Sequence, residues 1–146
     1  MKKIILIVFV SVLSIACTSK VNSSDIQKIN GYWEIEKVVF PDGKKKQYTI
    51  NVSFDYFEVK NNLGIRKKVT PQLNGTFLVN DDLEKVEIKL EQEKYFIYYT
   101  TFFNKWKEQI KSISDNEFVV VNDAGNEYHY KRANPINLND NGKKIK

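Results

Sequence analysis

The stretch Gly31-Tyr32-Trp33-Glu34-Ile35-Glu36-Lys37-Val38-Val39-Phe40 decides the fold class of this chain. Within it, the apolar residues Trp33, Ile35 and Val39 occupy positions of the same parity, and Glu34 falls between the first two. Successive side chains of a β-strand point to opposite faces, so this spacing predicts a strand with one buried and one solvated face. The same period of two recurs through most of the chain that follows.

Further strand-like segments come at short intervals, with runs of Asn, Asp and Gly between many of them. The predicted strands are Gln47 to Val52, Phe54 to Lys60, Ile65 to Thr70, Thr76 to Val79, Val86 to Gln92, Tyr95 to Phe102, Lys105 to Ile113, Phe118 to Asn122 and Glu127 to Arg132. Short strands joined by tight turns indicate an all-β fold, and they favour an antiparallel up-and-down β-barrel of about eight strands. Before the first strand, Ser24-Asp25-Ile26-Gln27 has the form of a capping box, which predicts a short helical turn with Ser24 as its N-cap.

The N-terminal segment has the composition of a secretory signal. Met1-Lys2-Lys3 is basic, the run Ile4 to Leu13 is apolar, and small residues follow it. This run is shorter than the roughly 20 residues that a membrane-spanning helix needs, so we predict a signal peptide over residues 1–16. Leu13-Ser14-Ile15-Ala16-Cys17 resembles the lipobox of bacterial lipoproteins, with Ser14 at a position where Leu is usual.

That resemblance implies that a lipid is attached at Cys17 and that the membrane is a partner through this lipid. The alternative is an unpaired thiol in a secreted protein without an anchor, since a single cysteine forms no internal disulfide. No acidic cluster follows Cys17, which favours a periplasm-facing protein on the outer membrane. We therefore expect a tether and helical turn over residues 17–28, a barrel over residues 29–132 and a disordered tail over residues 133–146.

A formal net charge of +5 is compatible with nucleic-acid binding, but the positions of the charged residues argue against it. Two lysines belong to the predicted signal peptide and three to the predicted tail. The rest, Cys17 to Arg132, carries eighteen basic and seventeen acidic side chains. This balance argues against a nucleic-acid partner. We expect Lys44-Lys45-Lys46 to be a solvated turn and Arg66-Lys67-Lys68 a solvated strand face.

Residues for catalysis or metal binding are few. His129 is the only histidine, it falls on the outward parity of a late strand, and no second His or Cys accompanies it. No nucleophile motif and no Gly-rich phosphate loop is present. We therefore predict a non-enzymatic, monomeric protein with no catalytic residue, no metal and no cofactor.

Three local features resemble the lipocalins, and in particular the short lipocalin-like domains of bacterial lipoproteins. They are Gly31-Tyr32-Trp33 after a helical turn, the closing segments from Trp106 to Arg132, and the even strand spacing between them. The resemblance covers Ile29 to Arg132 and implies a calycin-type barrel. It also implies that Trp33 plugs the barrel floor, that Arg132 stacks across it, and that Gly31 permits the tight backbone turn.

An eight-stranded barrel either packs solid or holds one small ligand. The alternation of their strands places the side chains of Lys37 and Glu108 inside the barrel. A charge there destabilises the fold unless it is paired or hydrated. In a ligand carrier these two charges would form the polar part of a site for a small apolar or amphipathic molecule, with Tyr99, Trp106 and Tyr128 as its wall. The alternative for the two charges is a bulge that shifts the parity and leaves both in solvent.

A second function class needs no ligand. In it the interior is packed, and an outward aromatic strip formed by Phe96, Tyr98 and Phe102 engages another component of the cell envelope. An exposed apolar patch of several hundred Å² would mark such an interaction surface.

Overall fold

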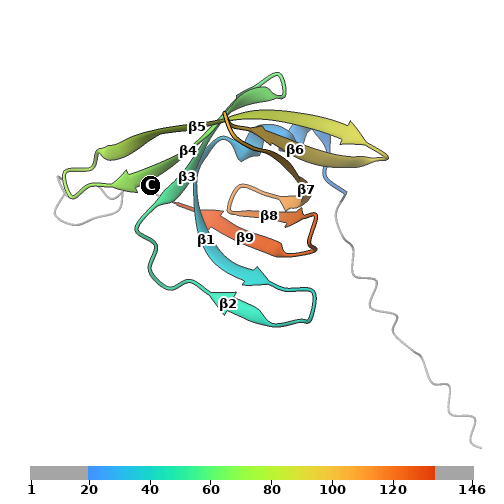
Figure 1. Ribbon diagram of the computed structural model, residues 1–146, viewed down its shortest axis with the longest axis horizontal. Helices are drawn as coiled ribbons and strands as arrows, with labels where there is room; N and C mark the ends of the chain where they lie inside the picture. The colour runs from blue at the N-terminus through green and yellow to red at the C-terminus, as the bar shows by residue number, and fades with distance from the viewer. Residues whose placement is uncertain (1–19, 134–146) are drawn as a thin grey trace, which may run out of the picture.

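The computed structural model describes residues 20–133, which form one antiparallel sheet that closes on itself (Figure 1). A 3-10 helix, η1 (Ser23–Ile29), comes first. The strands are β1 (Gly31–Val39), β2 (Lys45–Gln47), β3 (Phe54–Lys60), β4 (Leu63–Pro71), β5 (Phe77–Glu91), β6 (Lys94–Thr100), β7 (Lys105–Ile113), β8 (Glu117–Asn122) and β9 (Glu127–Arg132). From β3 onward each strand pairs with the next, and β9 pairs with β1 to complete the ring. The predicted closed barrel of eight strands, β1 and β3 to β9, is confirmed, with β2 as a short addition on the edge of β1.

Antiparallel strands reverse direction at each turn, so the turns alternate between the two ends of the barrel. One end, here called the floor, holds η1 and the β3–β4, β5–β6 and β7–β8 turns. There the Asn30 side chain exchanges two hydrogen bonds with the backbone of Val59, at 2.6 and 3.0 Å. The other end, here called the rim, holds the β1–β2, β4–β5, β6–β7 and β8–β9 loops and the connection from β2 to β3.

The apolar core begins at the floor and extends toward the rim as far as Tyr99. Trp33 lies at its centre, and its ring centroid is 5.4 Å from that of Phe118, which Phe57 meets edge-on at 6.0 Å. The buried members are Ile26, Ile29, Trp33, Phe57, Val59, Val86, Ile88, Ile97, Tyr99, Ile110, Phe118 and Val120. Each apolar Å² removed from water contributes about 25 cal/mol, so this cluster is the main stabilising element of the fold.

The predicted helical turn is present, but it begins one residue before the predicted cap. The N-cap is Asn22 rather than Ser24, and the Asn22 backbone N–H donates a 3.1 Å hydrogen bond to the Asp25 carboxylate. Ile26 and Ile29 face the barrel and are buried. Their three-residue spacing places both on the same side of a helix with about three residues per turn.

The strand predictions are corrected by the structure in two places. The segment Gln47 to Val52 is not a strand beyond Gln47, and Ile50 and Val52 are 86% and 78% exposed. The Asn51 amide instead donates to the backbone carbonyl of Ile35 at 2.8 Å, which holds the loop against the edge of β1. The separately predicted strands Thr76 to Val79 and Val86 to Gln92 are parts of one continuous strand, β5, whose pairing with β4 shifts register between them.

A bulge in β1 changes which residues face inward. The pairing of β1 with β9 shifts between Ile35 and Lys37, so Val38 rather than Val39 is buried and lies opposite Tyr128. A bulge inserts one residue and reverses the parity beyond it. The placement of Lys37 in the ligand site is therefore wrong, and the alternative of a bulge that shifts the parity holds for this residue. The Lys37 ammonium lies 3.8 Å from the neighbouring Glu36 carboxylate.

Candidate ligand-binding site

The floor is closed by Trp33 and Arg132. The Trp33 indole N–H donates to the Ile29 carbonyl at 2.7 Å, and the Arg132 guanidinium carbon lies 3.8 Å from the centroid of the indole ring. The guanidinium also donates to the carbonyls of Lys28, Asn30 and Asp115 at 2.7, 2.6 and 2.8 Å. This geometry is the one that the resemblance to lipocalins implied for the pair.

Gly31 is placed where the chain passes under Arg132. Its φ is +107°, and a Cβ atom there would lie 3.1 Å from Nη1 of Arg132. A glycine meets both requirements, since it adopts positive φ without steric cost and leaves room for the guanidinium. Gly31, Trp33 and Arg132 thus build the floor of the barrel.

The structure brings four of the five predicted ligand-binding residues together in the half of the barrel next to the rim. Tyr99 of β6 and Trp106 of β7 lie directly opposite each other, with their rings stacked at 5.0 Å. Glu108 lies two residues further along β7, between Ile97 and Asn122, and is only 9% exposed. The fourth is Tyr128 of β9, whose hydroxyl accepts a 3.3 Å hydrogen bond from the Asn122 amide. Their role in binding stays a prediction.

Arg66 also lies inside the barrel, which corrects the expectation of a solvated strand face. It pairs in register with Phe57 on one side and Glu84 on the other, and its side chain is 13% exposed. The guanidinium forms an ion pair with Glu84 and lies over the Tyr99 ring, 4.3 Å from its centroid. Arg66 therefore contacts both the aromatic ring of Tyr99 and the carboxylate of Glu84.

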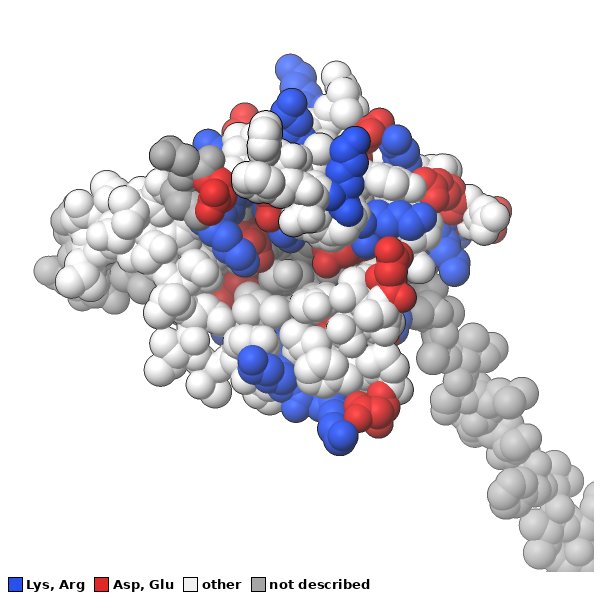
Figure 2. Space-filling model, in the orientation of Figure 1, with Lys and Arg blue, Asp and Glu red and all other residues white. Residues whose placement is uncertain are grey.

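Asp55 and Lys68 complete the charged group. Asp55 is 2% exposed, and the Lys68 ammonium lies 2.7 Å from its carboxylate. We call these residues the inner polar cluster: Asp55, Arg66, Lys68, Glu84, Tyr99, Trp106, Glu108, Tyr128 and Tyr130. They come from six of the eight barrel strands. Figure 2 shows acidic and basic atoms close together in a recess near the middle of this face.

The alternation in the sequence indicates that Asp55 faces the interior, but no pattern indicates the inward position of Arg66. Asp55 shares its parity with Phe57 and Val59, so the alternation of β3 already placed a carboxylate on the inner face. In β4 the apolar residue Val69 has the opposite parity to Arg66 and is buried in a second, outer cluster with Phe54. Because of this outer cluster, β4 has an apolar face on the outside of the barrel. Alternation alone therefore assigns the inner and outer faces of β4 the wrong way round.

Burial raises the pKa values of three acidic groups in the inner polar cluster. Burial raises the pKa of Glu108 above its ordinary value, although Arg66 and the Tyr99 hydroxyl act in the opposite direction. Burial also raises the pKa values of Tyr99 and Tyr130 well above the usual range, so both phenols stay neutral. Oε2 of Glu108 has no hydrogen-bond partner among the described residues.

The outer aromatic strip predicted at Phe96, Tyr98 and Phe102 is interrupted. The Lys107 ammonium lies 4.7 Å from the Phe96 ring centroid, and Lys89 lies 4.8 Å from that of Tyr98, so both rings are partly covered. Phe102, in contrast, is 95% exposed in the β6–β7 loop. It stands beside Phe103 and borders a hollow of about 260 Å³ that Leu83 also lines.

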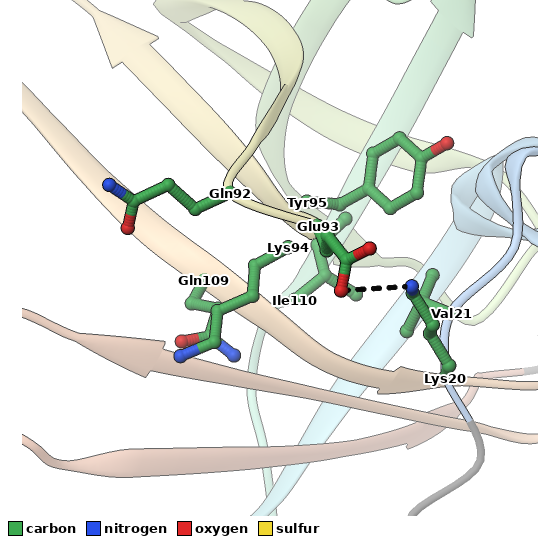
Figure 3. Close-up of a pocket in the computed structure, with 8 residues that line it drawn as sticks. All are labelled: Lys20, Val21, Gln92, Glu93, Lys94, Tyr95, Gln109 and Ile110. Atoms are coloured by element: carbon green, nitrogen blue, oxygen red, sulfur yellow. Dashed lines mark ion pairs between the residues drawn. The ribbon is translucent and has the colours of Figure 1, made fainter.

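A larger hollow, of about 320 Å³, lies at the floor (Figure 3). It is lined by Lys20, Val21, Gln92, Glu93, Lys94, Tyr95, Gln109 and Ile110. The Lys20 ammonium lies 3.3 Å from the Glu93 carboxylate across one side of it, and both side chains are largely exposed. Neither this hollow nor the one beside Phe102 contains a predicted ligand-binding residue.

Other functional candidates are limited within the described chain. His129 lies on the outer face with Nε2 3.3 Å from a Glu127 carboxylate oxygen. Across residues 20–133, no three His, Cys, Asp or Glu side chains are grouped so that they could hold a metal ion. The same residues include no helix with the length and apolar character needed to cross a membrane. Cys17 lies outside the described residues.

No protein-family model matches the sequence, and no curated protein matches it. A lipocalin-like protein from Bacteroides uniformis superposes with a TM-score of 0.46 at 10% identity, over 73% of this chain and 99% of that one. Apocrustacyanin C2 gives the same TM-score and identity over 82% of this chain and 68% of its own.

The class of protein follows from the barrel itself. Eight antiparallel strands in sequential order, the β1–β9 closure and a helical segment beneath the first strand form an up-and-down barrel, which is the architecture of lipocalins. The expected lipocalin-like, calycin-type fold is therefore confirmed.

Proposed function

We propose that this chain is a lipid-anchored protein of the bacterial cell envelope whose barrel binds one small amphipathic molecule at the inner polar cluster. The observation that carries the proposal is the set of five charged side chains on the inner face of the barrel. They are Asp55, Arg66, Glu84 and Glu108, which are largely buried, and Lys68, whose side chain is 55% exposed and pairs with Asp55.

The energetic cost of these charges is the reason for a binding role. Charges removed from water destabilise a fold unless partners compensate them, and apolar residues of similar volume are usually as good or better. A barrel of eight strands is wide enough to be filled with side chains or to hold one small ligand. A barrel that served only as a packed scaffold has no need for such a cluster.

The aromatic side chains supply the complementary apolar wall. Trp106 and Tyr128 are only partly buried and lie next to the charged residues, so the wall reaches solvent on the rim side. Ligand sites in proteins are commonly lined by aromatic side chains with a few polar groups that fix orientation. An amphipathic molecule fits this combination better than a purely apolar one.

Binding is tested with the mature chain, residues 17–146, carrying Cys17→Ser to remove the lipid. Native mass spectrometry after incubation with an envelope lipid extract should show one bound small molecule per chain. Titration should also quench the fluorescence of Trp106 and not that of a Trp106→Phe variant, since Trp33 is sealed in the floor. The absence of any bound species and of any quenching would exclude the carrier role.

The proposed anchor is a lipid on Cys17, on the periplasmic side of the outer membrane. It is supported by the basic, apolar and lipobox-like segments that precede this residue. In cells, Cys17→Ser should move the protein from the membrane fraction to the soluble fraction and abolish incorporation of labelled palmitate. Unchanged fractionation and labelling would contradict the anchor without affecting the ligand proposal.

A protein-interaction module is the second candidate, and the exposed rim favours it. Leu83, Phe102 and Phe103 stand together at the β6–β7 loop, with both phenylalanine rings almost fully in solvent. The double variant Phe102→Ser, Phe103→Ser should abolish cross-linking to an envelope protein if the rim is an interaction surface. Retention of cross-linking in this variant would remove the second candidate.

A further inference from the structure

The inner polar cluster contains one more carboxylate than it contains basic groups. Asp55, Glu84 and Glu108 are acidic, whereas Arg66 and Lys68 are basic. Lys68 is committed to Asp55 at 2.7 Å, and Arg66 is committed to Glu84 while it covers the Tyr99 ring. Glu108 forms no ion pair of its own among the described residues, although Arg66 lies near enough to lower its pKa.

Glu108 has an oxygen that is ready to accept a hydrogen bond. The side chain lies on the inner face of β7 between Trp106 and Ile110, and its Oε2 has no partner among the described residues. A buried acceptor without a partner costs about 1–3 kcal/mol, and more when it is charged. A ligand that donates to this oxygen would regain that free energy on binding.

We infer that the ligand of this barrel is an amphipathic amine, whose protonated amino group binds Oε2 of Glu108 while its apolar body lies against Trp106 and Tyr128. The inference rests on the proposed ligand-binding function and specifies the chemical class of its ligand.

The charges around the site favour an ammonium head over a carboxylate head. A carboxylate would bring a second negative charge next to Glu108 and Glu84, and like charges in a poorly solvated site repel strongly. Arg66 would have to leave Glu84 to compensate it. An alcohol would donate a hydrogen bond to Oε2 but would not neutralise the negative charge of Glu108, so it should bind with intermediate affinity.

Affinity for an amine should rise with pH. The titratable groups that act on Glu108 are Asp55 of β3, Arg66 of β4, Glu84 of β5 and Tyr99 of β6, and Tyr130 of β9 interacts with it as well. Burial raises the Glu108 pKa in the free protein, so the pH range in which the carboxyl group loses its proton lies higher than for an exposed glutamate. An ammonium binds the ionised form, and raising the pH through that range therefore increases its affinity.

Three probes with the same chain length test the inference: n-decylamine, 1-decanol and decanoate, each below its aggregation concentration. Dissociation constants are measured by Trp106 fluorescence at pH 5 to 8 with the mature Cys17→Ser chain. We expect decylamine to bind at least tenfold more tightly than decanoate at pH 7, and its affinity to increase between pH 5 and pH 7. The affinity for decanol should change by less than twofold over the same range.

Glu108→Gln should weaken decylamine binding at least tenfold and leave decanol within twofold. The matched control is Glu87→Gln, which removes the same charge from the outer face of β5, where Glu87 pairs with Lys89 at 3.0 Å. Equal or tighter binding of decanoate, or an unchanged decylamine affinity in Glu108→Gln, would overturn the inference and leave the carrier role standing. Failure of all three probes to bind would overturn the inference, and the experiment with the lipid extract decides the carrier role separately.

Discussion

Arg132 joins three segments of the chain that lie far apart in the sequence. Its guanidinium covers the Trp33 ring and donates to carbonyls of η1 and its C-cap and to one of the β7–β8 turn. Carbonyls at the end of a helix have no partner within the helix, and the arginine supplies donors to two of them. One side chain thus closes the floor and attaches the N-terminal helix to the last strand.

Arg132→Ala should lower the free energy of unfolding by roughly 2–4 kcal/mol, because it removes three charge-assisted hydrogen bonds and the contact with the indole. Chemical denaturation of the mature chain measures this change. The control is Lys131→Ala, whose exposed 3.5 Å ion pair with Glu34 contributes little. Equal effects of the two substitutions would show that Arg132 does not stabilise the floor.

Glu108 should make the barrel less stable as the pH rises. Its folded pKa lies above its ordinary value because of burial, so the folded state favours the protonated form, and this stabilisation is lost as the pH rises through the folded pKa. Glu108→Gln mimics the protonated acid. Thermal melts should therefore show a higher Tm than the wild type at pH 8 and a matching Tm near pH 4. A lower Tm of the variant at pH 8 would contradict this account.

At the scale of strands, two irregularities decide which side chains face inward. The bulge in β1 turns Lys37 outward and Val38 inward, and the register shift between β4 and β5 lets β5 continue as one long strand. The outer cluster adds a second apolar face, where Tyr32 stacks on Phe77 at a centroid distance of 4.4 Å. These strands therefore have apolar side chains on both faces over part of their length.

The β3–β4 hairpin has a backbone approach that only glycine permits. A Cβ atom on Gly64 would collide with the carbonyl oxygen of Glu58 and with the backbone of Val59. Gly64→Ala should therefore lower the free energy of unfolding by at least about 2 kcal/mol, because the backbone cannot move away as a side chain would.

Gly43 is the matched control for that substitution. It has a positive φ of +83° in the β1–β2 turn, but a Cβ atom added there would meet no other atom within 4 Å. Gly43→Ala should cost only about 1 kcal/mol, from backbone strain alone. Urea unfolding of both variants measures the difference, and a smaller effect at Gly64 than at Gly43 would refute the steric explanation.

At the scale of the whole molecule, the proposed anchor would orient the barrel. Val21 packs against the core at the floor, and Cys17 precedes it by only four residues. Four residues span at most about 14 Å. A lipid on Cys17 would therefore hold the floor close to the membrane and leave the rim, with Phe102 and the inner polar cluster, facing away from it.

Fluorophores at the two ends of the barrel test this orientation. A label on Lys60→Cys, at the floor, should be quenched by spin-labelled lipid headgroups in vesicles that carry the acylated protein. A label on Asp123→Cys, in the β8–β9 loop of the rim, should not be quenched. Stronger quenching at residue 123 than at residue 60 would reverse the proposed orientation. The native Cys17 is blocked by its lipid in this experiment.

The sequence by itself determined the strand periodicity and the closed barrel, because each depends on the order of local patterns, whereas the Trp33–Arg132 floor was implied by the resemblance to lipocalins. The sequence also indicated Tyr99, Trp106, Glu108 and Tyr128 by their positions in the predicted strands, although the strand that contains Tyr99 is apolar on both faces. Only the tertiary structure decided that Lys37 lies outside and that Arg66, with Glu84, lies inside. Parity assigns residues to one of two faces, but bulges and an outer apolar cluster decide which of those faces becomes the interior.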